Sequence, residues 1–304
     1  MKKIKEQLRK NSTLHFLYSK YIDCKAHQLY KKRTKENKIH VYSIEETIKK
    51  IVADRSSIVR FGDGELAIII GKEISFQKYD SKLSKSLENI LRSKEPGLLV
   101  GIPDIFEGLD LYTKKDITYW ERNLMDTYGI WNRVIKSGNY YNAFVTRPYM
   151  IFEDKKQSAK YFEMFFELYS NREVVLVEGE QSRLGCGNDL FKNVTKLERI
   201  LCPTKNAYDK YDEILMEIKK QPKKKLILLS LGPTAKLLAY DLYKIGYQVL
   251  DIGHIDLEYE WYLRGAKEKI KIDNKFVNEA RDQNQDIKKT FDEKYENEII
   301  AKVI

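Results

Sequence analysis

The alternation of apolar and polar positions along the chain predicts an α/β fold. Short runs rich in Val, Ile and Leu predict strands, and longer segments with apolar residues at helical spacing predict helices between them. The predicted strands are 57–61, 97–102, 172–180, 196–203, the first part of 224–246, and 247–253. The predicted helices are 43–54, 81–92, 118–136, 155–169, 207–219, the last part of 224–246, and 255–265, whereas 66–70 fits a helix or a strand. Buried strands that alternate with helices indicate a doubly wound, mostly parallel sheet with helices on both faces.

The two ends of the chain fall outside this pattern. KKRTKENK, residues 31–38, predicts a linker between a helical arm, residues 1–40, and a body that begins with a capping box at Ser43 and Glu46. The chain after Lys271 is charged and is expected to be peripheral. The predicted division is an arm at 1–40, one large domain at 41–272 and a charged extension at 273–304. One apolar side of the arm is expected to consist of Leu14, Phe16, Leu17, Tyr21 and Ile22.

The basic character of the chain belongs to the arm. Residues 1–40 contain 12 Lys and Arg against 3 Asp and Glu, and the remaining residues contain 43 against 42. A basic arm suits an acidic partner, nucleic acid or an acidic membrane surface, and a solvated charged helix is the simpler interpretation. The nearly neutral body argues against a nucleic-acid-binding face.

Cysteine and histidine usage excludes several kinds of site. The three cysteines are widely spaced without a CxxC pair, which fits a reducing compartment and argues against a thiolate zinc site. Three of the four histidines lie in the first forty residues, so the body has no set of histidines for a metal cage. No apolar run reaches transmembrane length, and no apolar segment follows the basic start as in a secretory signal. We therefore expect a cytoplasmic location.

Two predicted strand ends carry residues suited to a metal and a diphosphate. Ligands of doubly wound sheets bind outside the carboxyl ends of the strands. In GDGE, residues 62–65, Asp63 and Glu65 are spaced to face one hard cation, although an Asp-Gly turn also explains them. The loop 179–191 combines glycines with Arg183, which suits an anion nest and bidentate contact with a diphosphate. An ordinary surface loop is the alternative.

Two further strand ends complete the set. SLGPTAKLL, residues 230–238, places Thr234 at a helix start, where free N–H groups favour an anion, and it contains neither a GxGxxG nor a P-loop sequence. A capped helix start is the alternative. DIGHIDLEYEW, residues 251–261, gathers His254 with four acids, from which a metal ligand and a general base can be drawn. A helix with solvated acids and one packed histidine is the alternative.

Taken together and in this order, these stretches resemble the bacterial GT-D-type glycosyltransferase family. The resemblance covers roughly residues 40–270 and rests on RFGDGE, GEQSRLGCGNDLF, ILCP, SLGPTAKLLAYDL and DIGHIDLEYEW. The family includes enzymes that extend glycans on serine-rich repeat adhesins of Gram-positive bacteria. The resemblance implies a Rossmann-like α/β fold and transfer of a hexose, glucose or galactose, from a UDP-sugar to a hydroxyl of a growing glycan, with Mn²⁺ or Mg²⁺ as cofactor.

The resemblance also implies roles for individual residues. Asp63 and Glu65 form the D-x-E motif and are expected to bind the metal with His254, directly or with one acid acting through water. Glu260 is the first choice for the general base, Asp256 the second, and His254 lines the reaction centre, with an inverting path preferred. The residues expected to contact the UDP-sugar are Arg60, Glu180, Ser182, Arg183, Gly185, Gly187, Asn188, Asp189, Pro203, Asn206, Leu231, Gly232, Pro233 and Thr234.

The predicted partners are the UDP-hexose donor and a glycan-bearing protein acceptor. The arm is a candidate for contact with a second copy of the chain or with partner glycosyltransferases, whereas contact with nucleic acid or membrane is not predicted. Two other functions fit parts of the sequence: a Rossmann methyltransferase or sugar-nucleotide dehydrogenase, which the missing GxGxxG argues against, and a non-enzymatic protein that binds through its basic arm.

Overall fold

The computed structural model describes residues 12–135, 137–275 and 292–304. The described residues form two compact units. The first comprises parts of Met1–His40 with Ile105–Gly138 and Ile151–Asp154, and the second comprises Val41–Asp104, Asn139–Met150 and Lys155–Ile304. The predictions for residues 1–11 of the arm and 276–291 of the extension lie outside the described residues.

In the first unit, helix α2 (Ser12–Lys35) packs on helix α6 (Lys114–Val134). α2 buries Ala26 and Tyr30, and the hydroxyl of Tyr30 donates to the carbonyl of Ile105 at 3.0 Å. The helix continues to Lys35, so the prediction of a linker that begins at residue 31 was wrong for 31–35. The predicted apolar side does not face α6: the exposed residues include Leu14, Phe16, Leu17 and Tyr21.

In the part of the chain that the structure describes, nine strands form one sheet. The strands are β1 (Ile39–Val41), β2 (Ser57–Arg60), β3 (Leu98–Ile102), β4 (Gly138–Asn142), β5 (Glu173–Gly179), β6 (Lys196–Cys202), β7 (Leu226–Ser230), β8 (Gln248–Asp251) and β9 (Ile299–Lys302). Their order is β1-β4-β3-β2-β8-β7-β5-β6-β9, and each neighbouring pair from β4 to β9 is parallel. Central strands such as β5 and β7 are almost entirely buried, as expected for a parallel sheet covered on both faces. The predicted fold class is therefore confirmed.

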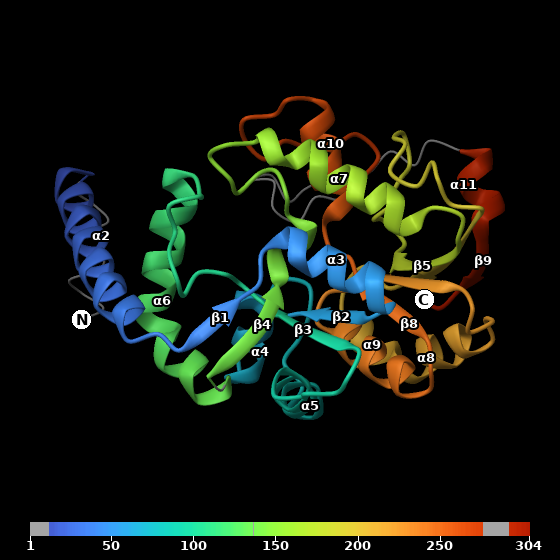
Figure 1. The fold of residues 1–304 in the computed structure, drawn as a ribbon, viewed down its shortest axis with the longest axis horizontal. Coiled ribbons are helices and arrows are strands. Elements are labelled where there is room, and N and C mark those ends of the chain that lie inside the picture. The colour runs from blue at the N-terminus through green and yellow to red at the C-terminus, as the bar shows by residue number, and fades with distance from the viewer. Residues whose placement is uncertain (1–11, 136, 276–291) are drawn as a thin grey trace. The chain divides into compact units, whose positions relative to one another are not determined.

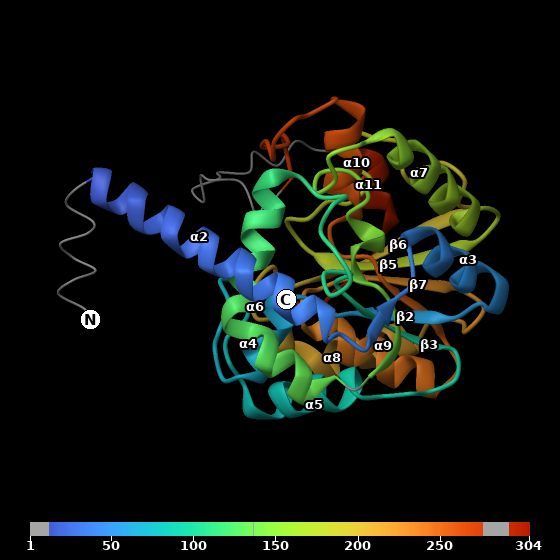
Figure 2. The ribbon, with the colours of Figure 1, turned by 60° about the vertical axis from the view of Figure 1, so that its left-hand side comes forward.

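Helices of the second unit cover both faces of this sheet (Figures 1 and 2). On one face lie α4 (Asp63–Ile69), α5 (Ser81–Leu91), α8 (Tyr211–Lys219) and α9 (Thr234–Lys244). On the other lie α3 (Ile44–Asp54), α7 (Lys156–Tyr169) and α10 (Ile255–Leu263). The remaining elements are α11 (Glu293–Glu298) and the 3₁₀ turns η1 (Ala143–Thr146) and η2 (Ala207–Lys210). The capping box is confirmed, because Glu46 N–H donates to Ser43 Oγ and Ser43 N–H donates to the Glu46 carboxylate.

The structure differs from the sequence prediction at two further places, and it decides between the helix and the strand that the prediction left open for 66–70. Strands β1 and β4 lie in segments for which the sequence predicted no strand. The run 66–70 belongs to helix α4, which begins at Asp63 within the D-x-E motif. The extension after Lys271 is not peripheral throughout, because Lys275 is buried and β9 pairs with β6 as the edge strand of the sheet.

Among the helices that the structure describes, none has the length and apolar content needed to cross a bilayer.

Candidate functional site

The four polar loops singled out in the sequence follow four strands that are neighbours in the sheet. GDGE follows β2, 251–261 begins at the end of β8, 230–238 begins at the end of β7, and 179–191 begins at the end of β5. These strands stand in the order β2-β8-β7-β5 and run parallel, so their carboxyl ends share one edge of the sheet. This is the edge at which doubly wound folds bind ligands.

A buried charge cluster of Arg60, Glu65, Lys236 and Asp251 lies at this edge. Asp251 Oδ1 accepts from Arg60 Nη2 at 3.0 Å, and Asp251 Oδ2 lies 3.0 Å from Lys236 Nζ. Lys236 Nζ also lies 2.8 Å from Glu65 Oε1. The cluster thereby joins β2, β8, α4 and α9. Burial alone raises the pKa of Asp251, but Arg60 and Lys236 outweigh burial and hold that pKa below its usual value.

Gly253 allows Arg60 to lie against the backbone that follows β8. Arg60 Nε donates to the carbonyl of Asp251 at 2.8 Å, and Nη1 donates to the carbonyl of Ala143 at 3.1 Å. Gly253 has a φ of 44°, and a Cβ at this position would lie 2.0 Å from Nη2 of Arg60. A side chain there would therefore displace the guanidinium and strain the backbone as well.

The two acids of the D-x-E motif lie in the first turn of α4 but have different surroundings. Asp63 is exposed, whereas the Glu65 side chain is 12% exposed and its Oε2 accepts from Gly62 N–H at 2.9 Å. Two carboxylates suit a hard cation that takes its remaining ligands from phosphate oxygens. In the described part of the chain no three His, Cys, Asp or Glu side chains form a metal-binding group, so His254 is not brought into such a group with Asp63 and Glu65.

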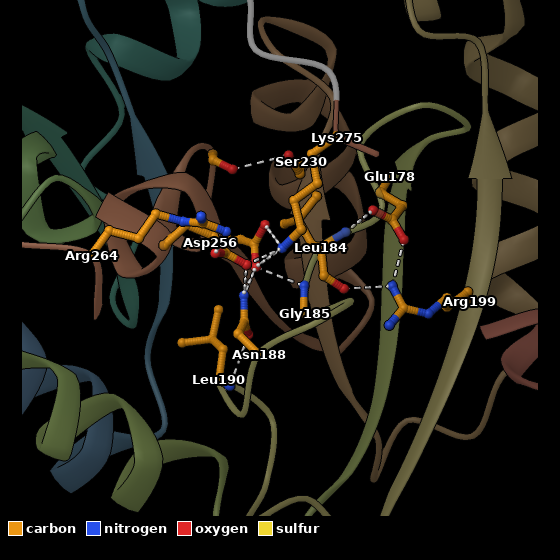
Figure 3. A network of polar contacts seen from close by, with 12 residues as sticks. Glu178, Leu184, Gly185, Asn188, Leu190, Arg199, Ser230, Asp256, Arg264 and Lys275 are labelled. Carbon is orange, nitrogen blue, oxygen red and sulfur yellow. Dashed lines mark hydrogen bonds and ion pairs between the residues drawn. The ribbon is translucent and has the colours of Figure 1, made fainter. Parts of the chain in front are cut away.

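A second buried cluster forms around Asp256 and Glu260 of α10. Figure 3 shows Asp256 with Lys275, Asn188 and Gly185. Lys275 Nζ lies 2.8 Å from Asp256 Oδ2 and 2.9 Å from Glu260 Oε1. From the loop after β5, Asn188 Nδ2 donates to Asp256 Oδ1 and to Glu260 Oε1, both at 2.8 Å. Gly185 N–H donates to Asp256 Oδ1 at 2.8 Å. We refer to Asp256, Glu260, Lys275 and Asn188 as the Asp256 cluster.

The charges of the Asp256 cluster stabilise each other. Burial raises the pKa of Glu260, but Lys275 and the amide of Asn188 outweigh it, so that the net pKa lies below its usual value. Burial lowers the pKa of Lys275, but Asp256 and Glu260 reverse that effect and raise it. Glu260 is therefore held as a carboxylate beside a permanent ammonium group.

The residues predicted to contact the UDP-sugar lie at or shortly after the ends of β2, β5, β6 and β7. Two of them, Gly185 and Asn188, donate hydrogen bonds to Asp256. Asn206, with a φ of 54°, holds the segment 76–78: its N–H donates to the Phe76 carbonyl, and its Oδ1 accepts from Lys78 N–H. Arg183 is 6% exposed and stacks on the ring of Tyr295 at 4.5 Å. Its predicted contact with a diphosphate remains a prediction.

The sequence analysis missed several charged residues that organise the site. Lys236 interrupts the apolar side of α9, and Glu178 and Arg199 stand inside the apolar strands β5 and β6. A charged residue within an apolar run is itself a sign of a buried ion pair. Lys275 lies in a charged segment without periodicity, so nothing in its local sequence predicts that it is buried.

Asp251→Asn is expected to destabilise the second unit strongly. The substitution leaves two buried cations without their shared carboxylate, so we expect the unfolding free energy at pH 7 to fall by about 3–5 kcal/mol. Urea unfolding measures this change. The pKa of Asp251 is lowered on folding, so its contribution is present above the unfolded value of about 3.9 and is lost as the pH falls through the folded pKa. The difference between wild type and variant should therefore shrink below about pH 4.

The matched control for this prediction is Asp54→Asn. Asp54 is exposed and pairs with Lys50 one turn earlier in α3, so its replacement should cost less than about 1 kcal/mol. Equal losses in the two variants would show that the Arg60 and Lys236 ion pairs do not stabilise the fold.

Comparison with known proteins identifies relatives along most of the chain. The Glycosyltransferase GlyD of Streptococcus pneumoniae serotype 4 is 41% identical over 268 residues, which are 88% of this chain and 33% of the relative. A probable glycosyl transferase Gly of Streptococcus gordonii is 39% identical over 267 residues, which are 88% of this chain and 39% of the relative. This chain thus spans between a third and two fifths of the length of these two curated relatives.

Solved structures show the same fold. A structure of the highly conserved domain of unknown function 1792, described as a distinct glycosyltransferase fold, has a TM-score of 0.86 and 40% identity, covering 91% of this chain and 99% of that one. A glycosyltransferase from Streptococcus sanguinis has a TM-score of 0.85 and 38% identity, covering 88% and 100%. The family model of the glycosyltransferase GT-D fold matches residues 58–280. The chain therefore belongs to the GT-D family of glycosyltransferases.

Proposed function

We propose that this chain transfers a hexose, glucose or galactose, from a UDP-sugar to a hydroxyl of a growing glycan with the help of Mn²⁺ or Mg²⁺. The observation that carries the proposal is the convergence of the D-x-E motif, the N-terminus of α9 and the loop after β5 at one edge of the sheet. Family membership supports glycosyl transfer, and the oxygen ligands of the motif support a hard cation.

The donor side of the proposed reaction lies between α4 and α9. Breakage of the bond between sugar and diphosphate leaves negative charge on the diphosphate, which must be neutralised. A divalent cation held by Asp63 and Glu65 supplies Lewis-acid stabilisation of that charge when it is bound. The chain contributes the positive dipole end of α9, which begins at Thr234. Lys236 fixes Glu65, so the motif keeps one geometry before the substrate binds.

The acceptor side is proposed to lie at the Asp256 cluster. Glu260 is the first candidate for the general base that takes the proton from the acceptor hydroxyl, and Asp256 is the second. Lys275 and Asn188 hold both carboxylates in place. The lowered pKa of Glu260 keeps it ionised at neutral pH and also weakens it as a base.

The proposed acceptor is a glycan-bearing protein of the serine-rich repeat adhesin type, modified in the cytoplasm. Two of the most similar curated proteins are streptococcal glycosyltransferases, which supports a bacterial glycan as the substrate class. We also propose that the arm contacts a second copy of the chain or a partner glycosyltransferase. The exposed apolar residues of α2 support such a contact.

A donor screen tests the proposed function. The protein is incubated with individual UDP-sugars and Mn²⁺, and UDP release is measured. We expect release from UDP-glucose or UDP-galactose that chelation of the metal abolishes. Asp63→Ala and Glu65→Ala should each lower turnover by about 10²-fold or more, because the cation then loses a ligand. Thermal shift with UDP and Mn²⁺ provides a second measurement.

Glu73→Ala is the matched control for both variants, because Glu73 is an exposed acid shortly after the same helix. Its turnover should equal that of wild type. Full turnover in Asp63→Ala would show that the motif is a structural turn. Thermal stabilisation by NAD or S-adenosylmethionine alone would point to a different Rossmann-like enzyme.

Glu260→Gln and Asp256→Asn separate the two candidates for the general base. Replacement of the true base should lower kcat by about 10²–10⁴-fold and leave KM for the UDP-sugar nearly unchanged. We expect the larger loss in Glu260→Gln, measured with an acceptor glycan. Thermal unfolding serves as the control, since each variant also removes an ion pair to Lys275. Equal, small losses in both folded variants would place the base elsewhere.

A further inference from the structure

The C-terminal segment Asp292–Lys302 lies beyond the region that the GT-D family model matches, which ends at residue 280. It nevertheless belongs to the sheet. β9 pairs parallel with β6, and Val303 N–H donates to the Leu201 carbonyl at 2.7 Å. Just before β9, α11 buries Tyr295 to 4% exposure. A segment outside the family core thus reaches the interior beside the loop that follows β5.

The ring of Tyr295 contacts two buried guanidinium groups. Arg183 lies 4.5 Å and Arg199 4.7 Å from the centre of the ring, and both arginines are less than a tenth exposed. Cation–π contacts are strongest where water is excluded. Among the described residues the Tyr295 hydroxyl has no hydrogen-bond partner, so the ring makes the contact and the hydroxyl does not contribute to it.

Arg199 connects the ring of Tyr295 to the backbone of the loop that follows β5. Its Nη1 donates to the Leu184 carbonyl at 2.8 Å and to Glu178 Oε1 at 2.6 Å (Figure 3). Its Nε donates to Glu298 Oε2 at 2.7 Å. Glu178 Oε2 in turn accepts from Leu184 N–H at 2.8 Å. Both backbone polar groups of Leu184 are therefore fixed from β5 and β6, and Glu298 of α11 fixes Arg199.

The loop needs this support because of its backbone conformation. Arg183 has a φ of 48°, a left-handed conformation that costs free energy for a residue with a side chain. Gly185, two residues later, also has a positive φ, and its N–H donates to Asp256. A small change at Arg183 or Leu184 therefore shifts the groups that the loop presents to the Asp256 cluster.

We propose that Tyr295, together with Glu298, is a positioning residue for the UDP-sugar loop 180–189, so that the C-terminal segment is a working part of the transferase site. The positioning role affects the reaction only if this loop contacts the nucleotide, so the inference rests on the proposed function. Stacking of Tyr295 holds Arg183 and Arg199, and the carboxylate of Glu298 also holds Arg199. The loop is thereby shaped before the donor arrives.

The test compares Tyr295→Leu with Tyr295→Phe. Leu keeps an apolar side chain without a π face, and Phe keeps the ring without the hydroxyl. We expect Tyr295→Leu to raise KM for the UDP-sugar about tenfold with kcat nearly unchanged, and Tyr295→Phe to behave like wild type. Amide hydrogen exchange at Leu184 and Gly185 should be faster only in Tyr295→Leu. Unchanged KM and exchange in a folded Tyr295→Leu would overturn the proposal.

Glu298→Gln provides a second variant if Tyr295→Leu does not fold. It weakens the contact with Arg199. We therefore expect it to raise KM and to speed amide exchange, each by less than Tyr295→Leu does. Glu296→Gln, an exposed acid of the same helix, is the control and should change neither. If wild type releases UDP from no UDP-sugar, the proposed function fails, whereas exchange at Leu184 and Gly185 still tests the positioning role. Equal exchange in all variants would overturn that role.

Discussion

The buried carboxylate of Asp251 is the constraint on which the proposed donor side of the site depends. An unpaired carboxylate in the interior costs several kcal/mol, so a fold that buries one must bring cations to it. Arg60 at the end of β2 and Lys236 in α9 meet this requirement, and Lys236 also pairs with Glu65 in α4. One electrostatic requirement therefore fixes two strands and two helices at the edge where the D-x-E motif stands. The motif is therefore positioned by the ion pair between Glu65 and Lys236, in addition to the turn that its glycines allow.

The proposed acceptor side is also held together by the burial of charge, with different elements. Asp256 and Glu260 are both buried in α10, and Lys275 compensates for both. Because Lys275 belongs to the segment after α10, the chain must fold back over that helix for the acids to be stable there. Asn188 and Gly185 add hydrogen bonds from the loop after β5, so this loop and the acids of α10 are in direct contact. A change in the loop conformation alters the acids as well.

The sequence predicts the parts of this arrangement that depend on local pattern and misses those that depend on distant contacts. The strands β2, β5, β7 and β8 are apolar runs followed by polar loops, and parallel pairing then places the loops at one edge. The ion pairs at that edge join residues far apart, such as Arg60 and Asp251, so no local pattern contains them. The linker predicted from residue 31 is helix to Lys35, because packing on α6 overrides the polar composition.

Strand β9 illustrates why the end of the chain was misjudged. Its residues, Ile299–Lys302, follow a charged segment, and only their pairing with β6 makes them a strand. Arg183 is a related case: an arginine between glycines after a buried strand suggests an anion ligand, and the ring that it stacks on is more than a hundred residues away. Long-range partners of this kind become visible only in three dimensions.

The asymmetry of the D-x-E motif follows from these contacts. Both oxygens of Glu65 are engaged in the structure, one by Lys236 and one by Gly62 N–H, whereas Asp63 is exposed at the start of the helix. For a cation that approaches the motif, the Asp63 side chain is exposed to solvent, whereas the Glu65 carboxylate already pairs with the ammonium group of Lys236. Coulombic repulsion between cation and ammonium makes direct binding to Glu65 less favourable than binding to Asp63, unless diphosphate oxygens screen the two charges. Glu65 therefore has a structural task, the fixation of Lys236 and thereby of Asp251, that does not depend on any metal.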